Sequence, residues 1–383
     1  MDTAVGTLRY VRNEEVAAQP SPRLARGPIA WVRERLLSSP LNVLLTLATL
    51  ILLSWLLPPL VNFLFVDAVW SGADRAACRT ETAGQPVGAC WAFVRDRLSY
   101  FVYGSYPVAE RWRVDVVFVL FAFGLAWMLW LNSPRRGLGA LYVFVVLPVI
   151  AFVLLSGATW LGLEPVPSSL WGGMLVTFLV AIVGIVSALP LGILLALGRR
   201  SKLPIVRLFS IIFIEFWRGV PLITVLIMAN TMLPLFLPDN ITIDRLLRPL
   251  VGIALFTSAY LAEVVRGGLQ AMPKGQYEGA MSLGLNYRQM MSLIILPQAL
   301  RIVIPGIVNS FISLFKDTSL VAIVGIFDFI RTIEAARIDP IWAAPTVNFT
   351  GYAFAALFYF IFCFGMSRYS LMVERRLAAG QRR

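Results

Sequence analysis

The chain of 383 residues contains no histidine, three lysines, three cysteines and few charged residues overall. The absence of histidine excludes catalytic triads, general bases and metal sites that depend on an imidazole ring. The phosphate-binding pattern GxxxxGKS/T is also absent, and none of the lysines, Lys202, Lys274 and Lys316, lies in a phosphate-binding loop. Any ATP chemistry therefore belongs to another chain. No metal site and no cofactor held by this chain are expected.

Apolar residues dominate instead, because 58% of the sequence is hydrophobic and only 14% is charged. A soluble protein of this composition would need an implausibly large core, whereas long apolar runs are what a bilayer demands. With about 20 residues for each membrane-spanning helix, the sequence predicts an all-α polytopic membrane protein with eight transmembrane helices. The predicted spans cover residues 41–62, 114–132, 138–156, 172–197, 206–236, 249–267, 301–324 and 350–370.

The net charge of +12 does not indicate a nucleic-acid-binding protein. Basic residues lie at the ends of the apolar spans and not in one patch, as the positive-inside rule describes. An even number of spans then places both termini in the cytoplasm. Residues 1–40 contain no apolar stretch and no small-residue cleavage site, so we interpret them as a retained cytoplasmic tail and not as a signal peptide. Residues 377–383 would form a second cytoplasmic tail.

A polar and aromatic loop at residues 65–113 separates the first two spans and is expected on the exported side. It contains Cys78 and Cys90, which are twelve residues apart and could close a disulfide in an oxidising compartment. The alternative is two free thiols, which exported loops seldom keep. Cys363, inside the last span, is expected to pack as a small apolar residue.

Residues 278–297 read EGAMSLGLNYRQMMSLIILP and predict two short helices joined at a glycine. Gly284 suits the position just after a helix, because it adopts φ > 0 without a Cβ clash. Asn286 can cap the next helix, and Gln289 three residues later completes a capping box. Pro297 is expected to end the unit. The alternative is an ordinary amphipathic helix between two membrane spans.

The same run resembles the EAA loop of ABC importer membrane subunits, a cytoplasmic element through which an ATPase moves the transport path. The resemblance extends over residues 165–376, which look like the five-helix core of the polar amino acid branch of ABC permeases, with a coupling loop at 270–297. Residues 41–164 add three helices, a layout similar to the larger membrane subunit of the general L-amino-acid uptake system of Gram-negative bacteria. The matching positions in the coupling loop are Glu278, Gly279, Ala280, Gly284, Ile294, Leu296 and Pro297.

This resemblance implies a permease subunit of an ATP-driven importer of polar L-amino acids in the bacterial inner membrane. The chain would form the translocation path and perform no covalent chemistry. The implied partners are a second homologous permease subunit, ATP-binding subunits that hold ATP and Mg²⁺, an exported amino acid binding protein, the L-amino acid and membrane lipid, but no nucleic acid. An ion-coupled secondary amino acid transporter is the alternative, although it would leave the EAA-like run without a role.

The stretch FIEFWRGVPL also matches the polar amino acid branch. Glu215 and Arg218 lie three residues apart on one helix face, which permits an ion pair between two charges that are costly in a membrane. Gly219 and Pro221 then break the helix. We interpret this stretch mainly as architecture, with a direct place in the substrate path as the alternative.

A second matching stretch, YLAEVVRGG, leads from the next core helix into the coupling loop. Glu263 and Arg266 are again three residues apart. Tyr260 and Glu263 share a helix face near the inner half of the span. Both side chains are therefore candidates for the path.

The run KDTS lies inside the predicted span 301–324, where charged residues face a bundle interior, a partner charge or water. An amino acid carries an ammonium and a carboxylate, and this run offers one charge of each sign beside two hydroxyls. The alternative is that Lys316 and Asp317 pair with each other, or that each bonds to neighbouring helices, and that they only fix packing. The candidate translocation path comprises Asn309, Ser313, Lys316, Asp317, Thr318 and Ser319, together with Tyr260 and Glu263.

Overall fold

The computed structural model describes residues 27–130, 133, 135–236, 238 and 243–381. Residues 1–26 of the expected N-terminal tail, and 382 and 383 of the expected C-terminal tail, lie outside the described residues. The described regular structure is helical, apart from three isolated bridges. The prediction of an all-α protein is therefore confirmed. The chain divides into two compact units, residues 1–67 and 68–383.

The first unit contains one long apolar helix. A short helix α1 (Pro28–Arg35) precedes α2 (Pro40–Val61), and the Ser39 side chain caps α2 by accepting a hydrogen bond from the Asn42 backbone N–H at 3.2 Å. The π-helical turn η2 (Asn62–Val66) extends α2 to 27 residues. At 1.5 Å per residue this helix is about 40 Å long, which exceeds the thickness of a bilayer core.

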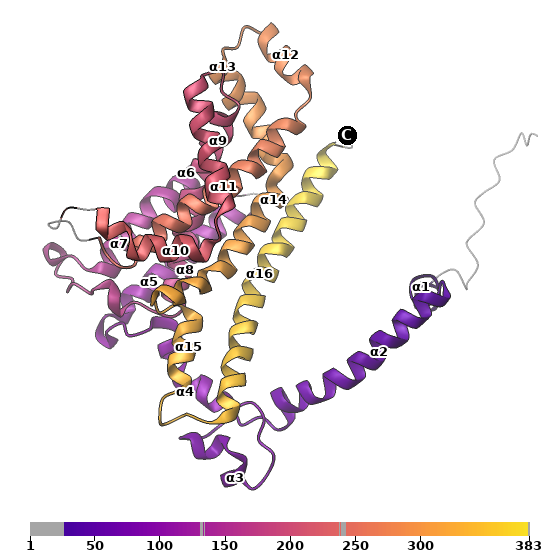
Figure 1. Cartoon of the computed structure of the whole chain (residues 1–383), viewed down its shortest axis with the longest axis vertical. Helices are drawn as coiled ribbons and strands as arrows, with labels where there is room; N and C mark the ends of the chain where they lie inside the picture. The colour runs from indigo at the N-terminus through magenta and orange to yellow at the C-terminus, as the bar shows by residue number, and fades with distance from the viewer. Residues whose placement is uncertain (1–26, 131–132, 134, 237, 239–242, 382–383) are drawn as a thin grey trace, which may run out of the picture. The chain divides into compact units, whose positions relative to one another are not determined.

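The second unit holds the remaining spans, and Figure 1 shows its helices gathered into one bundle. Its first helices are η3 (Arg75–Cys78), α3 (Thr80–Ala83), α4 (Trp91–Tyr103), η4 (Val108–Glu110), α5 (Arg111–Leu129), α6 (Arg136–Leu141), η5 (Tyr142–Val146), α7 (Leu147–Ser156), η6 (Thr159–Leu161) and η7 (Ser168–Leu170). The later ones are α8 (Met174–Arg199), α9 (Pro204–Gly219), α10 (Leu222–Thr231), η8 (Leu233–Phe236), α11 (Leu247–Ala271), α12 (Lys274–Ser282), α13 (Tyr287–Gln289), η9 (Met290–Ile295), α14 (Leu296–Asp317), η10 (Thr318–Val324), α15 (Phe329–Arg337) and α16 (Pro345–Gln381).

Within the described residues, seven helices are long and apolar enough to cross a membrane, or up to eight if the pair α9 and α10 counts as one span. The apolar segment predicted at 206–236 consists of two helices, α9 and α10, which meet at 102°. The helix stops at Gly219, and both Val220 and Pro221 adopt extended ψ values, 135° and 140°. Proline has no N–H to continue a helix and disfavours helical geometry in the residue before it. The predicted break at Gly219 and Pro221 is confirmed.

Helix α11 lies at the centre of the bundle and makes its most extensive contacts with α8 and α14. Glycines allow α11 to pack closely against both α8 and α14. A methyl group at Gly192 of α8 would come within 2.8 Å of Leu261 Cβ, and one at Gly268 of α11 within 2.6 Å of the Ala299 carbonyl oxygen of α14. Close contact between these backbones leaves little room for independent movement of the three helices.

The two ends of the second unit are built differently. Figure 1 shows α12 and α13 at one end of the bundle and α3, α4 and α15 at the opposite end. The C-terminal half of α16 runs toward the end that carries α12. The expected coupling segment and the cysteine-containing loop are therefore separated by the length of the bundle.

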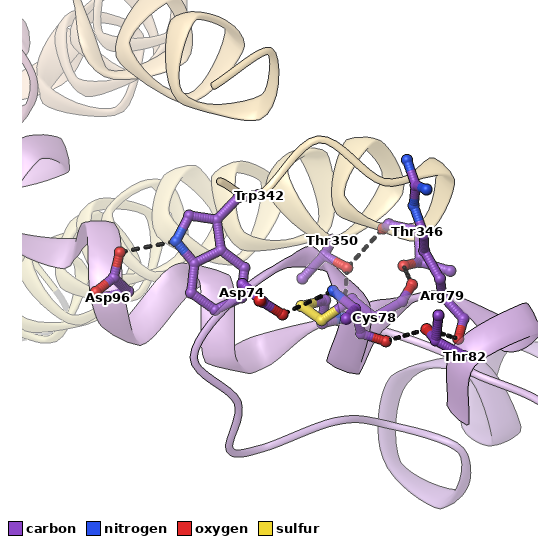
Figure 2. Close-up of a disulfide and its surroundings, with 10 residues drawn as sticks. Asp74, Cys78, Arg79, Thr82, Asp96, Trp342, Thr346 and Thr350 are labelled. Atoms are coloured by element: carbon purple, nitrogen blue, oxygen red, sulfur yellow. Dashed lines mark hydrogen bonds between the residues drawn. A yellow bond between two sulfur atoms is a disulfide. The ribbon is translucent and has the colours of Figure 1, made fainter. Parts of the chain in front are cut away.

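The cysteine-containing end is held together by a disulfide between Cys78 and Cys90, both fully buried. Figure 2 shows Trp342, which precedes α16, and Thr346 and Thr350 of α16 near the disulfide. Thr346 Oγ1 donates to the Cys78 carbonyl oxygen at 2.9 Å, and the Cys90 N–H donates to Thr350 Oγ1 at 2.8 Å. Trp342 Nε1 donates to the Asp96 carboxylate at 2.8 Å. The two threonine bonds fasten the segment that precedes α4 to α16, and the Trp342 bond joins α4 to the segment before α16.

Asp328 is a buried carboxylate at the same end. It caps α15, accepting hydrogen bonds from the Ile330 N–H at 3.1 Å and the Arg331 N–H at 3.0 Å. Burial raises the pKa of Asp328 to about 7, against the effect of these hydrogen bonds, and the nearby Glu334 carboxylate adds to the rise. The folded chain therefore binds a proton at Asp328 more tightly than the unfolded chain does.

This difference predicts a pH-dependent stability. A carboxyl with a raised folded pKa disfavours the folded state as it ionises, so the contribution of Asp328 to stability should be greatest below about pH 4 and fall until about pH 7. The expected loss is about 2–4 kcal/mol. We expect the Asp328→Asn variant, which can still cap α15, to lose less thermal stability than the wild type between pH 5 and pH 8. An equal loss in both proteins would contradict this assignment.

Candidate functional site

The expected coupling segment forms a helix, a glycine turn and a second helix. α12 ends before Gly284, whose φ is 73°. The Asn286 side chain accepts a hydrogen bond from the Gln289 backbone N–H at 2.9 Å, and the Gln289 side chain accepts one from the Asn286 N–H at 3.1 Å. The predicted glycine conformation and the predicted capping box are therefore confirmed.

The residues of α12 that match the EAA pattern point in different directions. Ala280 is 2% exposed and packs into an apolar cluster with residues of α8, α11 and α14. Glu278 and Gly279 are exposed, and nothing lies within 4 Å of the position that a Gly279 side chain would occupy. Leu283, just after the helix, is 76% exposed. One face of α12 therefore holds the segment on the bundle, and the other presents a low, partly apolar surface.

The end of the segment differs from the prediction. Ile294 and Leu296 pack against the same apolar cluster as Ala280. The expectation that Pro297 ends the unit is wrong, because α13 continues through the π-helical η9 into α14. Pro297 falls in the first turn of α14, where π hydrogen bonding gives way to α bonding and its missing N–H is tolerated. The second coupling helix is therefore continuous with a membrane span.

Charged side chains of α8, α9 and α11 meet in one cluster. Glu263 accepts hydrogen bonds from Arg199 Nη1 at 2.8 Å and Arg266 Nη2 at 2.6 Å, and Arg218 Nη1 lies 3.9 Å from it. Arg199 Nη1 also donates to Glu215 Oε1 at 2.9 Å. The Glu263 side chain is only 15% exposed. Three guanidinium groups thus share one largely buried carboxylate, and we call these five residues the ion-pair cluster.

The cluster corrects the expected pairing of Glu215 with Arg218. Each of these residues reaches a neighbouring helix, Glu215 to Arg199 of α8 and Arg218 toward Glu263 of α11. The Arg218 guanidinium also lies 5.7 Å from the ring centroid of Tyr260. Spacing along one helix allowed the pair, but the packing of α8 and α11 against α9 supplies closer partners for both charges.

A cavity of about 370 Å³ lies between α10, α11 and α14, on the side of Tyr260. Its lining mixes aliphatic and aromatic carbon with hydroxyl and amide groups, and Asp317 is the one charged residue that the described part of the chain contributes. This mixture is typical of sites for small organic ligands, and so is the volume. The lining residues are Leu222, Phe256, Thr257, Tyr260, Asn309, Ser310, Ser313, Leu314 and Asp317.

The cavity brings together half of the candidate path residues, namely Tyr260, Asn309, Ser313 and Asp317. Glu263 belongs instead to the ion-pair cluster. Thr257 and Ser310 also line the cavity, although neither was among the residues predicted from the sequence. Thr257 lies three residues before Tyr260 on the same face of α11, so helical spacing from Tyr260 would have identified it.

The rest of the KDTS run lies outside the cavity. Thr318 Oγ1 donates to the Phe315 carbonyl at 2.8 Å, and Ser319 Oγ donates to the Lys316 carbonyl at 2.9 Å, at the start of the 3₁₀ helix η10. Lys316 is exposed, and no ion pair within the described part of the chain joins it to Asp317. The alternative of a Lys316 and Asp317 pair is therefore not what the structure shows.

Comparison with known proteins gives one family. Residues 188–379 match the family model described as "Binding-protein-dependent transport system inner membrane component". The chain is 50% identical over 363 residues to the "Inner membrane amino-acid ABC transporter permease protein YhdY" of Escherichia coli (strain K12), covering 95% of this chain and 96% of that protein.

A second relative aligns with nearly the whole chain. The "Glutamate/glutamine/aspartate/asparagine transport system permease protein BztC" of Rhodobacter capsulatus is 40% identical over 433 aligned positions, which cover 97% of this chain and 99% of that protein. A solved structure described as "Crystal structure of an amino acid ABC transporter with histidines" aligns with a TM-score of 0.47 at 28% identity, covering 53% of this chain and 92% of its own.

Proposed function

The chain belongs to the family of binding-protein-dependent transport system inner membrane components, and on that premise we propose that it carries polar L-amino acids across the inner membrane at the cavity between α10, α11 and α14. As a member of this family it is a multi-pass inner-membrane permease and not itself an enzyme. The names of the two full-length relatives, an amino-acid permease and a glutamate, glutamine, aspartate and asparagine permease, support this substrate class.

The observation that carries the proposal is the cavity itself. An amino acid needs an acceptor for its ammonium and donors for its carboxylate. Asp317 supplies the acceptor for the ammonium, and Asn309, Ser313 and Tyr260 can supply donors for the carboxylate. The apolar lining leaves room for a side chain. The cavity lies between α11 and α14, the two helices that lead into and out of the coupling segment.

The partners that we infer follow from the family. A second homologous permease subunit would complete the path, ATP-binding subunits holding ATP and Mg²⁺ would dock on the exposed face of α12, and a binding protein would deliver the amino acid from the exported side. Both termini and α12 would then lie in the cytoplasm, with residues 41–164 as an addition to the permease core 165–376. Membrane lipid would surround the spans. An ion-coupled secondary transporter is not favoured by the family.

Transport by the purified assembly tests this proposal. We expect the chain, reconstituted in lipid vesicles with its ATP-binding subunits, second permease and binding protein, to hydrolyse ATP faster when polar L-amino acids are present and to accumulate them only with ATP. D-amino acids and sugars are the controls. Uptake that follows an ion gradient without ATP, or ATP hydrolysis that no L-amino acid stimulates, would overturn the proposal.

A further inference from the structure

Arg199, the last residue of α8, and Arg200, which follows it, connect two sites that are otherwise separate. Arg199 enters the ion-pair cluster, where it bonds to Glu215 and Glu263. Arg200 turns toward the coupling segment, where its Nη1 donates to the Leu269 carbonyl at 2.8 Å and to the Tyr277 hydroxyl of α12 at 3.0 Å. A displacement of α12 therefore reaches the end of α8 through Tyr277.

The Arg200 contact with α12 has more than one component. The guanidinium also lies 5.6 Å from the centroid of the Tyr277 ring, and the Tyr277 hydroxyl is 3.3 Å from the Leu269 carbonyl. A second polar contact, from Gln298 of α14 to Gln276 at 3.1 Å, joins α12 to a different helix. Tyr277 is thus a polar link from α12 to Arg200 at the end of α8 and to Leu269 of α11.

The other side of the ion-pair cluster faces the cavity. Arg218 lies 3.9 Å from Glu263 and 5.7 Å from the ring centroid of Tyr260, and Tyr260 lines the cavity. An occupant that moves the Tyr260 ring would change the position that Arg218 can hold near Glu263. Arg218 and Arg199 share this carboxylate, so a change in one alters the electrostatic environment of the other.

We propose that Arg218 and Arg200 are positioning residues on either side of Glu263 in a relay through which occupancy of the cavity controls the placement of α12. The relay runs from Tyr260 through Arg218, Glu263 and the neighbouring Arg199 and Arg200 to Tyr277. It rests on the proposed function, because it needs an amino acid in the cavity and an ATPase on α12. Coupling of this kind requires that the two ends influence each other reciprocally.

The test uses the complete transporter in lipid vesicles and measures ATP hydrolysis with and without a saturating transported amino acid and its binding protein. The variants are Arg218→Lys, Arg200→Met and Tyr277→Phe. Arg218→Lys keeps the positive charge, and Tyr277→Phe keeps the aromatic ring but removes the hydroxyl. We expect each to assemble with the ATP-binding subunits and to lower the ratio of stimulated to basal ATP hydrolysis about 3-fold to 10-fold. Arg207→Met is the matched control, because Arg207 of α9 is exposed and its guanidinium has no hydrogen bond or ion pair within the described residues.

A double variant separates a relay from independent packing defects. If Arg218 and Arg200 act in one chain of contacts, Arg218→Lys combined with Arg200→Met should lower the ratio no further than the stronger single variant. Losses that multiply, or single variants that keep the wild-type ratio, would overturn the relay. A wild-type complex that no amino acid stimulates would instead overturn the proposed function, so the two failures are distinguishable.

Discussion

Replacing Glu263 with glutamine is expected to lower the yield of folded protein severalfold, because one largely buried carboxylate serves three arginines. Glutamine keeps the size of the side chain but removes the charge, which leaves Arg266 without its partner and Arg199 with only the more exposed Glu215. Breaking a buried ion pair costs about 3–5 kcal/mol, and the partial exposure of the arginines points to the lower end of this range.

The measurements are detergent-solubilised yield and thermal unfolding, with two further variants. Glu334→Gln is the matched control, since Glu334 pairs with one arginine, Arg331, whose side chain is 47% exposed. Glu263→Gln combined with Arg266→Gln should recover part of the loss, because it also removes one stranded charge. Wild-type yield and unfolding temperature in Glu263→Gln would show that the cluster does not stabilise the fold.

The features that depend on neighbours in the sequence were predictable. Gly284 takes a positive φ and Asn286 pairs with Gln289 because these outcomes depend on a few adjacent residues. The break at Pro221 follows from its missing N–H in the same way. Its consequence, a 102° bend and not a gentle kink, depends on how α10 packs and has no local signal.

Partners across helices were not predictable from spacing. The three-residue spacing of Glu215 and Arg218 is compatible with a pair, and so is that of Glu263 and Arg266, yet only the second pair forms. The difference lies in α8, whose Arg199 approaches Glu215 in space from sixteen positions away in the sequence. Tertiary packing therefore decided which of two equivalent local patterns was realised.

The prediction of path residues along α14 was partly correct, because packing against other helices decides which of them face the cavity. Successive residues of a helix differ by about 100° in direction, so Asn309 and Lys316 lie near one another in projection. The cavity faces an arc that also includes Ser310 and Leu314, and Lys316 falls at its margin. The sequence showed the polar residues on one face of α14. It did not show which side of that helix would border the cavity formed with α10 and α11.

Asp317 is the side chain whose loss should reduce transport most. Among the described residues it is the one charged side chain that lines the cavity, so a substrate ammonium there would have no other carboxylate within that part of the chain. A hydrogen bond to a charged group contributes about 1.5–3 kcal/mol, so Asp317→Asn should slow amino acid uptake about 10-fold to 100-fold while the complex still assembles. Asparagine keeps the shape of the side chain, which limits any effect on folding.

Lys316→Met provides the comparison within the same run. Lys316 is exposed and does not line the cavity, so its replacement should change uptake far less than Asp317→Asn does. Uptake and amino-acid-stimulated ATP hydrolysis are measured for both variants in lipid vesicles, with folded yield as the reference. Wild-type uptake in Asp317→Asn would contradict an ammonium site at this carboxylate. Equal losses in the two variants would point to packing of α14 and not to recognition, because only one of the two side chains can reach an amino acid in the cavity.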